Sequence, residues 1–125
     1  MAELTLEQLL EVARRTVGPD VQVRDLGLLS AALGRVEARA FGRDVYPTVD
    51  HRAAALLHSL ATTDPLAEGN LPFAWAATAV YLARQGRPAM LTDAEAFDLV
   101  TDVVFGRLGT VEMIAERLRP DPASR

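Results

Sequence analysis

The sequence predicts an all-α fold, a compact bundle of about six helices around a buried central helix. Apolar residues recur at helical spacing along most of the chain. Threonine or aspartate precedes several of these periodic segments, as is typical of helix N-caps. A strand-like pattern is suggested only around residues 44–46. A chain of 125 residues suits one domain, which we expect to span residues 1–125.

Two helices are expected before residue 41. Thr5 and Gln8 have the spacing of a capping box, and Gly18-Pro19 ends the helix that they open. The apolar face of this helix comprises Leu6, Leu9, Leu10, Ala13 and Val17. Asp25 is the expected N-cap of the second helix. Its apolar residues repeat at helical spacing at Leu29, Leu33, Val36 and Ala40.

Residues 41–47 interrupt the helical pattern, as either a loop or a short hairpin. Thr48 is the expected N-cap of a third helix, and a polar loop follows it over residues 61–70. The inward residues of this helix are Ala53, Leu56, Leu57 and Leu60. The stretch 73–83 is apolar nearly all round, which predicts the buried central helix.

Two more helices are expected near the C-terminus. Thr92 and Glu95 form a second capping box, which opens a helix that continues to Leu108. Gly109-Thr110 separates it from the last helix. The apolar residues of the last helix are Val111, Ile114, Ala115 and Leu118.

The composition argues against several classes of function. The net charge of −4 is unfavourable for direct nucleic-acid binding. The absence of cysteine excludes disulfides, thiolate metal sites and a cysteine nucleophile. The N-terminus lacks the features of a secretory signal, and the longest apolar stretch is too short to cross a bilayer. We therefore expect a cytoplasmic protein that does not bind membranes.

The loop from Asp64 to Asn70 is the expected site of any chemistry, because it leads into the N-terminus of the central helix. Free backbone N–H groups and the helix dipole favour an anion there. Gly69 lets the backbone approach a ligand closely. The carboxylate of Glu68 can hold Mg²⁺ if phosphates complete the coordination shell. Asn70 would either cap the helix or orient a phosphate.

A simpler interpretation of the same loop is a helix-capping turn. Asp64-Pro65 is a common turn starter, and Gly69-Asn70 is a common turn dipeptide in which asparagine is a good N-cap. These residues alone leave both interpretations open. His58 lies on a helix, where a packed and hydrogen-bonded histidine is expected more often than a catalytic one.

A wider resemblance rests on stretches that follow one another in order from Leu26 to about Leu82. They are residues 33–39, 46–48, 53–60, 68–70, 74–77 and, at the end, 82–86. Together they resemble the Doc branch of the Fic family, the death-on-curing toxins. The resemblance implies a Fic/Doc-type helical fold, in which residues 41–47 occupy the position of a flap that docks the target. An ordinary helix–helix connection remains the alternative for this segment.

The family motif reads His-Pro-Phe-x-Asp/Glu-Gly-Asn-Lys/Gly-Arg, and residues 64–72 of this chain read Asp-Pro-Leu-Ala-Glu-Gly-Asn-Leu-Pro. Asp64 takes the place of the histidine that serves as general base. A carboxylate is a weak base near neutral pH, although it can still orient a hydroxyl. Leu71 and Pro72 replace the basic pair that holds nucleotide phosphates, and Pro72 also lacks an N–H donor.

The resemblance implies the toxin of a type II toxin–antitoxin module. Its activity would be phosphotransfer from ATP or another nucleoside triphosphate, with Mg²⁺, to a hydroxyl of elongation factor Tu. In that case Glu68 binds the metal, Gly69 and Asn70 cradle phosphate, and Asp64 orients the hydroxyl. The implied partner is a Phd-like antitoxin that folds onto a groove near the active site.

Two alternatives remain open. The replacements at Asp64, Leu71 and Pro72 favour a catalytically inactive Doc homologue that serves as a protein-binding module. An unrelated helical interaction protein is the third possibility, and an antiparallel bundle without the family arrangement over residues 48–86 would favour it.

Overall fold

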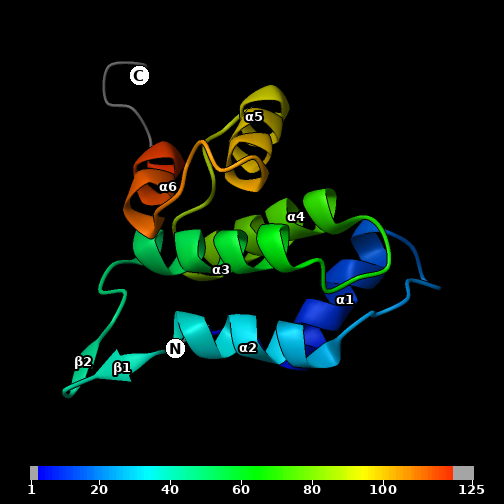
Figure 1. Cartoon of the computed structure of the whole chain (residues 1–125), viewed down its shortest axis with the longest axis horizontal. Coiled ribbons are helices and arrows are strands. Elements are labelled where there is room, and N and C mark those ends of the chain that lie inside the picture. Colours follow the sequence, from blue (N-terminus) through cyan, green and yellow to red (C-terminus); the bar gives the residue numbers. More distant parts are fainter. Residues whose placement is uncertain (1–2, 120–125) are drawn as a thin grey trace.

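Helices dominate the computed structural model, which describes residues 3–119 (Figure 1). The elements are α1 (Leu6–Thr16), α2 (Leu26–Val36), β1 (Arg39–Ala40), β2 (Arg43–Asp44), α3 (Val49–Thr63), α4 (Asn70–Arg84), α5 (Asp93–Val104) and α6 (Val111–Leu118). The predicted all-α class is confirmed by these six helices of the described chain. The predicted domain, residues 1–125, extends beyond the described residues at both ends.

The helices form three layers of two (Figure 1). One outer layer contains α1 and α2, the middle layer contains α3 and α4, and the other outer layer contains α5 and α6. Because the middle layer is covered on both faces, its helices need apolar residues on more than one side. The run Ala53 to Leu57 is accordingly buried at every position. The predicted buried central helix is confirmed in α4, and α3 shares the middle layer with it.

Four helix N-termini form where the capping residues predicted them, those of α1, α2, α3 and α5. Both capping boxes are present, Thr5 with Gln8 and Thr92 with Glu95. Three further N-caps accept a backbone hydrogen bond through their side chains: Asp25, Thr48 and Thr110. Local sequence therefore determines where most of the helices begin.

The segment after α2 is a short antiparallel hairpin, as one of the two predictions for residues 41–47 had it. Arg39 pairs with Asp44 and Ala40 pairs with Arg43. Phe41 and Gly42 close the turn with φ values of 54° and 77°. The prediction that Ala40 belongs to the second helix was wrong, because that helix ends at Val36 and Ala40 lies in a strand.

Three other helix boundaries differ from the sequence prediction. The third helix continues to Thr63, because Ala61 is buried in the core and adds to its packing. The central helix begins at Asn70, so the loop before it covers only residues 64–69. The fifth helix ends at Val104 rather than Leu108, because Gly106 adopts a left-handed conformation with φ 79°.

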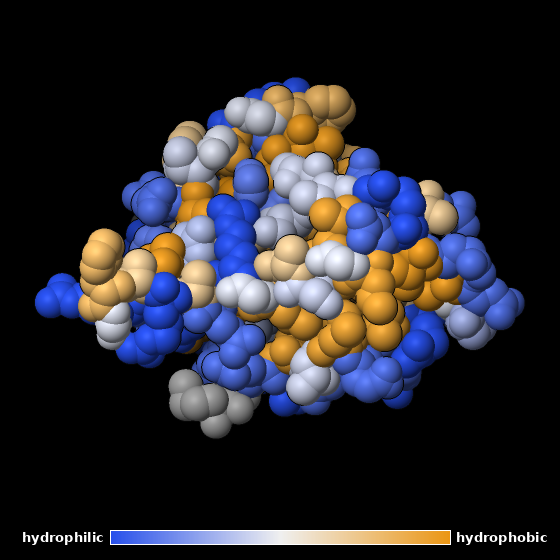
Figure 2. Space-filling view, turned by 60° about the horizontal axis from the view of Figure 1, so that its bottom comes forward, coloured by the Kyte–Doolittle hydropathy of each residue, from blue (hydrophilic) through white to orange (hydrophobic). Residues whose placement is uncertain are grey.

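The outer face of α1 and α2 is partly apolar. Figure 2 views the molecule from this side and shows apolar surface gathered in one area of the face. Leu6 and Leu10 of α1 and Leu33 of α2 are only half-buried, and Leu26 is 50% exposed. Among residues 3–119, no helix combines the length and apolar character that a membrane crossing requires.

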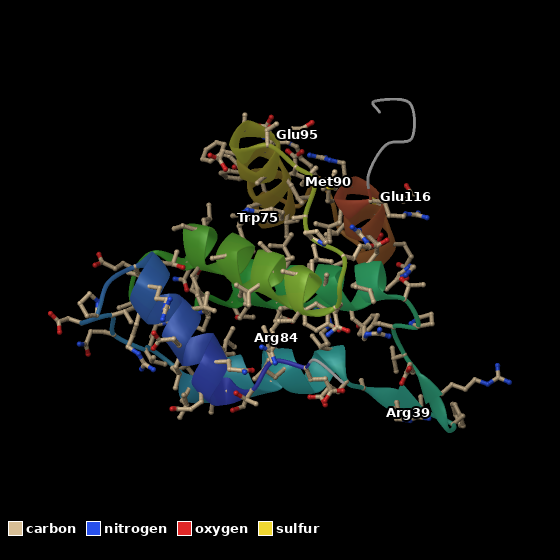
Figure 3. The ribbon with its side chains drawn as sticks, turned by 180° about the vertical axis from the view of Figure 1, so that it is seen from behind. Arg39, Trp75, Arg84, Met90, Glu95 and Glu116 are labelled. Carbon is tan, nitrogen blue, oxygen red and sulfur yellow. The ribbon has the colours of Figure 1, made fainter. Side chains whose placement is uncertain are left out.

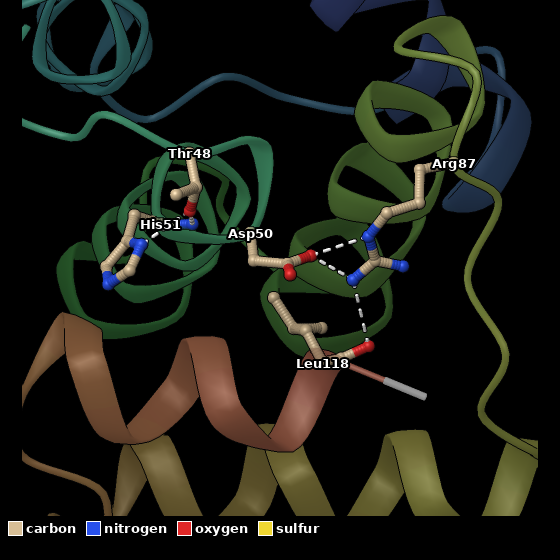
Figure 4. A network of polar contacts seen from close by, with 5 residues as sticks. All are labelled: Thr48, Asp50, His51, Arg87 and Leu118. Carbon is tan, nitrogen blue, oxygen red and sulfur yellow. Dashed lines mark hydrogen bonds and ion pairs between the residues drawn. The ribbon is translucent and has the colours of Figure 1, made fainter. Parts of the chain in front are cut away.

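Hydrogen bonds of Arg87 link the C-terminal helix α6 to the middle layer (Figure 4). Its guanidinium donates from Nε and Nη2 to Asp50 Oδ1 at the start of α3, the Nε bond being 2.7 Å long. The same Nη2 donates to the carbonyl of Leu118, the last residue of α6, at 3.2 Å. One arginine thereby joins the start of α3 to the end of α6.

Candidate phosphate-binding loop

Loop 64–69 connects the two helices of the middle layer, at the end where α1 also lies (Figure 1). Leu66 is 1% exposed, so the loop is attached to the core at its centre. The side chains of Asp64 and Glu68 are exposed on either side of that anchor. The structure thus holds the backbone of the loop firmly and leaves its two carboxylates in solvent.

Backbone hydrogen bonds join the loop to the connection between α1 and α2. The carbonyl of Pro65 accepts from the N–H of Arg24 at 2.8 Å and from that of Asp25 at 3.1 Å. Ala67 donates to the carbonyl of Gln22 at 2.9 Å, and Val23 bridges to Leu66. The local sequence could not predict this backbone pairing, because the paired residues lie about forty residues apart in the chain.

The side chain of Arg24 caps the C-terminus of α3. Its Nη2 donates to the carbonyl of Thr63 at 2.7 Å and its Nε to that of Asp64 at 2.6 Å. These carbonyls lie at the negative end of the helix dipole, where a cation is stabilising. Asp64 itself adopts the left-handed conformation that often ends a helix, with φ 51°. Sequence reasoning did not identify Arg24.

Asn70 closes the loop through its side-chain amide. Its Oδ1 accepts from the N–H of Leu66 and its Nδ2 donates to the carbonyl of Leu66, both at 2.9 Å. The prediction that Asn70 caps the helix was wrong. Asn70 is the first residue of α4, the N-cap is Gly69, and no side chain caps this terminus. The amide stabilises the loop, and the phosphate-binding role of Asn70 stays a prediction.

Gly69 is required at its position for two separate reasons. Its φ of 77° lies in the left-handed region, which other residues enter only with strain. A Cβ atom at this position would also lie 2.6 Å from Cγ2 of Val17, the C-cap of α1. The turn and the close approach of α1 therefore both exclude a side chain. The role of Gly69 toward phosphate is not tested by this packing and stays a prediction.

Glu68 lines a hollow of about 300 Å³ together with Ala67 and residues 17–22. Within residues 3–119, the structure brings no three potential metal ligands of the His, Cys, Asp or Glu type together. A magnesium ion at Glu68 would therefore take most of its ligands from water or from the phosphates of a nucleotide, as Mg²⁺ often does. The exposed carboxylate of Glu68 fits such a site.

His58 belongs to a hydrogen-bonded cluster around Arg35. Arg35 donates through Nη1 to Nδ1 of His58 at 2.9 Å and to the hydroxyl of Ser59 at 3.0 Å. Its Nε donates to the hydroxyl of Tyr46 at 3.0 Å. Burial lowers the pKa of His58, and the positive charge of Arg35 lowers it further. The packed, hydrogen-bonded interpretation of His58 is confirmed.

The base of the hairpin is held by Arg35 and by a second arginine. Arg52 donates through Nη1 to the carbonyls of Tyr46 and Pro47, at 3.1 and 3.2 Å. Its Nε donates to the hydroxyl of Tyr81 in α4 at 3.1 Å. The hairpin projects beyond the layers in Figure 1. Hydrogen bonds from Arg35 and Arg52 hold the chain where it passes from the hairpin into α3.

Two arginines that follow the loop in the chain, Arg84 and Arg87, lie away from it or are engaged elsewhere. Arg84 is the last residue of α4, which places it about 20 Å from the loop at 1.5 Å per residue. Arg87 is engaged by Asp50 and the carbonyl of Leu118.

Replacing Asn70 by alanine removes both hydrogen bonds to Leu66. We expect the free energy of unfolding to fall by about 1–3 kcal/mol, because the N–H and C=O of the buried Leu66 lose their partners. Chemical denaturation measures this change. Glu68→Ala is the matched control in the same loop, and its exposed side chain predicts an effect near zero. Equal effects of the two variants would contradict the role assigned to Asn70.

Gly69→Ala combines backbone strain with a steric collision, whereas Gly86→Ala has only the strain. The two glycines have φ values of 77° and 78°, but no atom lies within 4 Å of a Cβ at Gly86. We expect a loss of about 1–2 kcal/mol for Gly86→Ala and a clearly larger loss for Gly69→Ala. Thermal denaturation compares them. The added variant Val17→Ala should recover part of the difference, and failure to do so would argue against the collision.

The lowered pKa of His58 predicts a pH-dependent stability. The unfolded chain binds a proton on this histidine more readily than the folded chain does. The free energy of unfolding should therefore decrease as the pH falls from about 7 to about 5. His58→Gln removes the titrating group and should flatten this dependence in denaturant titrations. A slope identical to that of the original chain would rule out His58 as its source.

The chain is similar to a known protein over about two thirds of its length. No family model matches the chain. A curated protein described as Toxin Doc, from Mycolicibacterium smegmatis, is 42% identical over 83 residues, which are 66% of this chain and 64% of that protein. The match thus spans just under two thirds of the relative. This identity and the helical architecture agree with the resemblance seen in the sequence, and the chain is a homologue of the Doc toxin.

Proposed function

We propose that the chain is the toxin component of a type II toxin–antitoxin module, with loop 64–69 as its phosphate-binding element. The support comes from the relative described as Toxin Doc, together with the N-terminus of α4. This terminus has no side-chain cap, and its first backbone N–H groups have no partner within the helix. Such groups and the helix dipole attract the phosphates of a nucleotide.

In the proposed complex each residue of the loop has a separate task. Glu68 holds Mg²⁺ through its exposed carboxylate, and the metal would neutralise charge on the phosphates of ATP. Gly69 provides a backbone surface that a phosphate can approach. Asn70 keeps the loop in shape through Leu66 and offers its backbone N–H. Asp64 orients the accepting hydroxyl, which we propose belongs to elongation factor Tu.

A second candidate is a catalytically inactive homologue that retains only protein binding, including binding to a Phd-like antitoxin. The arrangement of cations favours it. The guanidinium of Arg24 is used for the carbonyls of Thr63 and Asp64, so it does not replace the absent basic pair at positions 71 and 72. Phosphate binding would then rest on backbone N–H groups and the metal alone.

Calorimetric titration with ATP and Mg²⁺ separates the two candidates. The proposed toxin should bind the nucleotide, and Glu68→Ala should weaken binding by at least tenfold because it removes the metal ligand. Glu112→Ala is the matched control, since Glu112 is an exposed glutamate on α6. No heat of binding at millimolar ATP would favour the inactive module.

A gain-of-function variant tests the origin of an inactive module. Asp64→His, Leu71→Lys and Pro72→Arg together restore the family motif. Recovered phosphotransfer to elongation factor Tu, measured with labelled ATP, would show that only these three side chains had been lost. Growth arrest on expression of the original chain, relieved by an antitoxin, would show that it needs no such repair.

A further inference from the structure

The hairpin of β1 and β2 stands away from the helices, and side chains at its base attach it to them. In Figure 3, where Arg39 is labelled on the hairpin, the strands extend beyond the ends of the helices. Phe41 at the tip is fully exposed, and Val45 is 45% exposed. Tyr46, the residue that follows, is half-buried and packs against the core. The position of the hairpin therefore depends on how Tyr46 is held.

Arg35 of α2 links Tyr46 to His58 of α3. Its Nε donates to the hydroxyl of Tyr46 at 3.0 Å, and its guanidinium lies 5.6 Å from the centre of the tyrosine ring. Its Nη1 donates to Nδ1 of His58 at 2.9 Å and to the hydroxyl of Ser59 at 3.0 Å. Because a guanidinium can only donate, Nδ1 must be the acceptor. The contact therefore requires a neutral His58 that carries its proton on Nε2.

A proton on Nδ1 of His58 is incompatible with this contact. Two N–H groups would then point at each other across 2.9 Å, and two positive charges would lie together in a half-buried site that water screens poorly. The long side chain of Arg35 can relieve the repulsion if its guanidinium moves toward solvent. The same guanidinium makes both contacts to Tyr46, so its displacement removes them together.

Arg35 is the charged group that acts on His58. Helix α3 packs against α2, α4, α5 and α6, and Arg35 is the one charged residue within α2. The other charged or titratable residues of these helices lie in the first turn of α3 (Asp50, His51, Arg52), near the end of α4 (Tyr81, Arg84) or in the opposite outer layer of α5 and α6 (Asp93, Glu95, Asp98, Asp102, Glu112, Glu116, Arg117; Figure 1). Burial lowers the pKa of His58, and the positive charge of Arg35 lowers it further. His58 is therefore neutral at pH 7 and becomes protonated only below about pH 6.5.

We propose that the protonation state of His58 controls how firmly the hairpin is attached. When His58 is neutral, Arg35 holds Tyr46 and the hairpin is fixed; when His58 is protonated, Arg35 is displaced and the hairpin moves about residues 46–47. Arg52 still holds the carbonyls of Tyr46 and Pro47, at 3.1 and 3.2 Å, so the hairpin pivots there and does not detach. This device lies at the start of α3, whereas the proposed phosphate site follows its end, and neither proposal rests on the other.

NMR spectroscopy of the full chain tests the proposal without any substitution. Backbone order parameters of residues 39–45 should be about 0.85 at pH 8, as in a rigid backbone, and should fall toward about 0.6 at pH 5. The ring signals of Tyr46 should shift with the same midpoint as those of His58. The amide of the buried Thr78 in α4 is the internal reference and should stay rigid. Unchanged hairpin order parameters at a pH at which the His58 signals show a protonated ring would overturn the proposal.

Three single variants identify the titrating group. His58→Gln can still accept from Arg35 but cannot be protonated, so its hairpin should stay rigid at both pH values. His51→Gln is the matched control, because His51 is the second of the two histidines and bonds to Thr48 just after the hairpin. Glu37→Gln removes the C-cap carboxyl of α2, whose pKa is raised by its hydrogen bond with Glu3.

The two control variants should respond to pH as the original chain does, and circular dichroism checks that each variant folds. A pH response that persists in His58→Gln, or that disappears in either control while His58 still titrates, would overturn the proposal. None of these measurements contains nucleotide, so their outcome is independent of ATP binding.

Discussion

The packing of α3 against α4 is the contact on which the rest of the structure depends. These helices form the middle layer, and α1 with α2 and α5 with α6 cover its two faces. The chain must turn between two helices that touch along their length, which restricts loop 64–69 to a tight path. Leu66, at the centre of the loop, is buried and so attaches this turn to the same core. The position of the candidate site is therefore a consequence of core packing.

The hydrogen bonds of the loop explain why its residues allowed two interpretations. Asn70 neither caps α4 nor lies free, because its amide is paired with the backbone of Leu66. This pairing leaves the first N–H groups of α4 uncapped by any side chain, which is the condition for anion binding. A structural role of the asparagine side chain and a functional role of the helix terminus are thus compatible.

The cations of the chain mostly serve its architecture. Arg24 caps α3, Arg35 and Arg52 hold the hairpin, and Arg87 joins α3 to α6. Loop 64–69 and α5 themselves contain only acidic charged residues. The phosphate binding proposed for the loop would consequently rely on backbone donors and a metal ion.

Local patterns in the sequence predict the helical class, most helix N-termini and the location of the loop, because capping side chains and apolar periodicity act over a few residues. The helix extensions to Thr63 and from Asn70, and the strand at Ala40, depended on packing and pairing that periodicity does not contain. Arg24 and Arg35 could not be assigned from the sequence, since their partners lie 40 and 23 residues away.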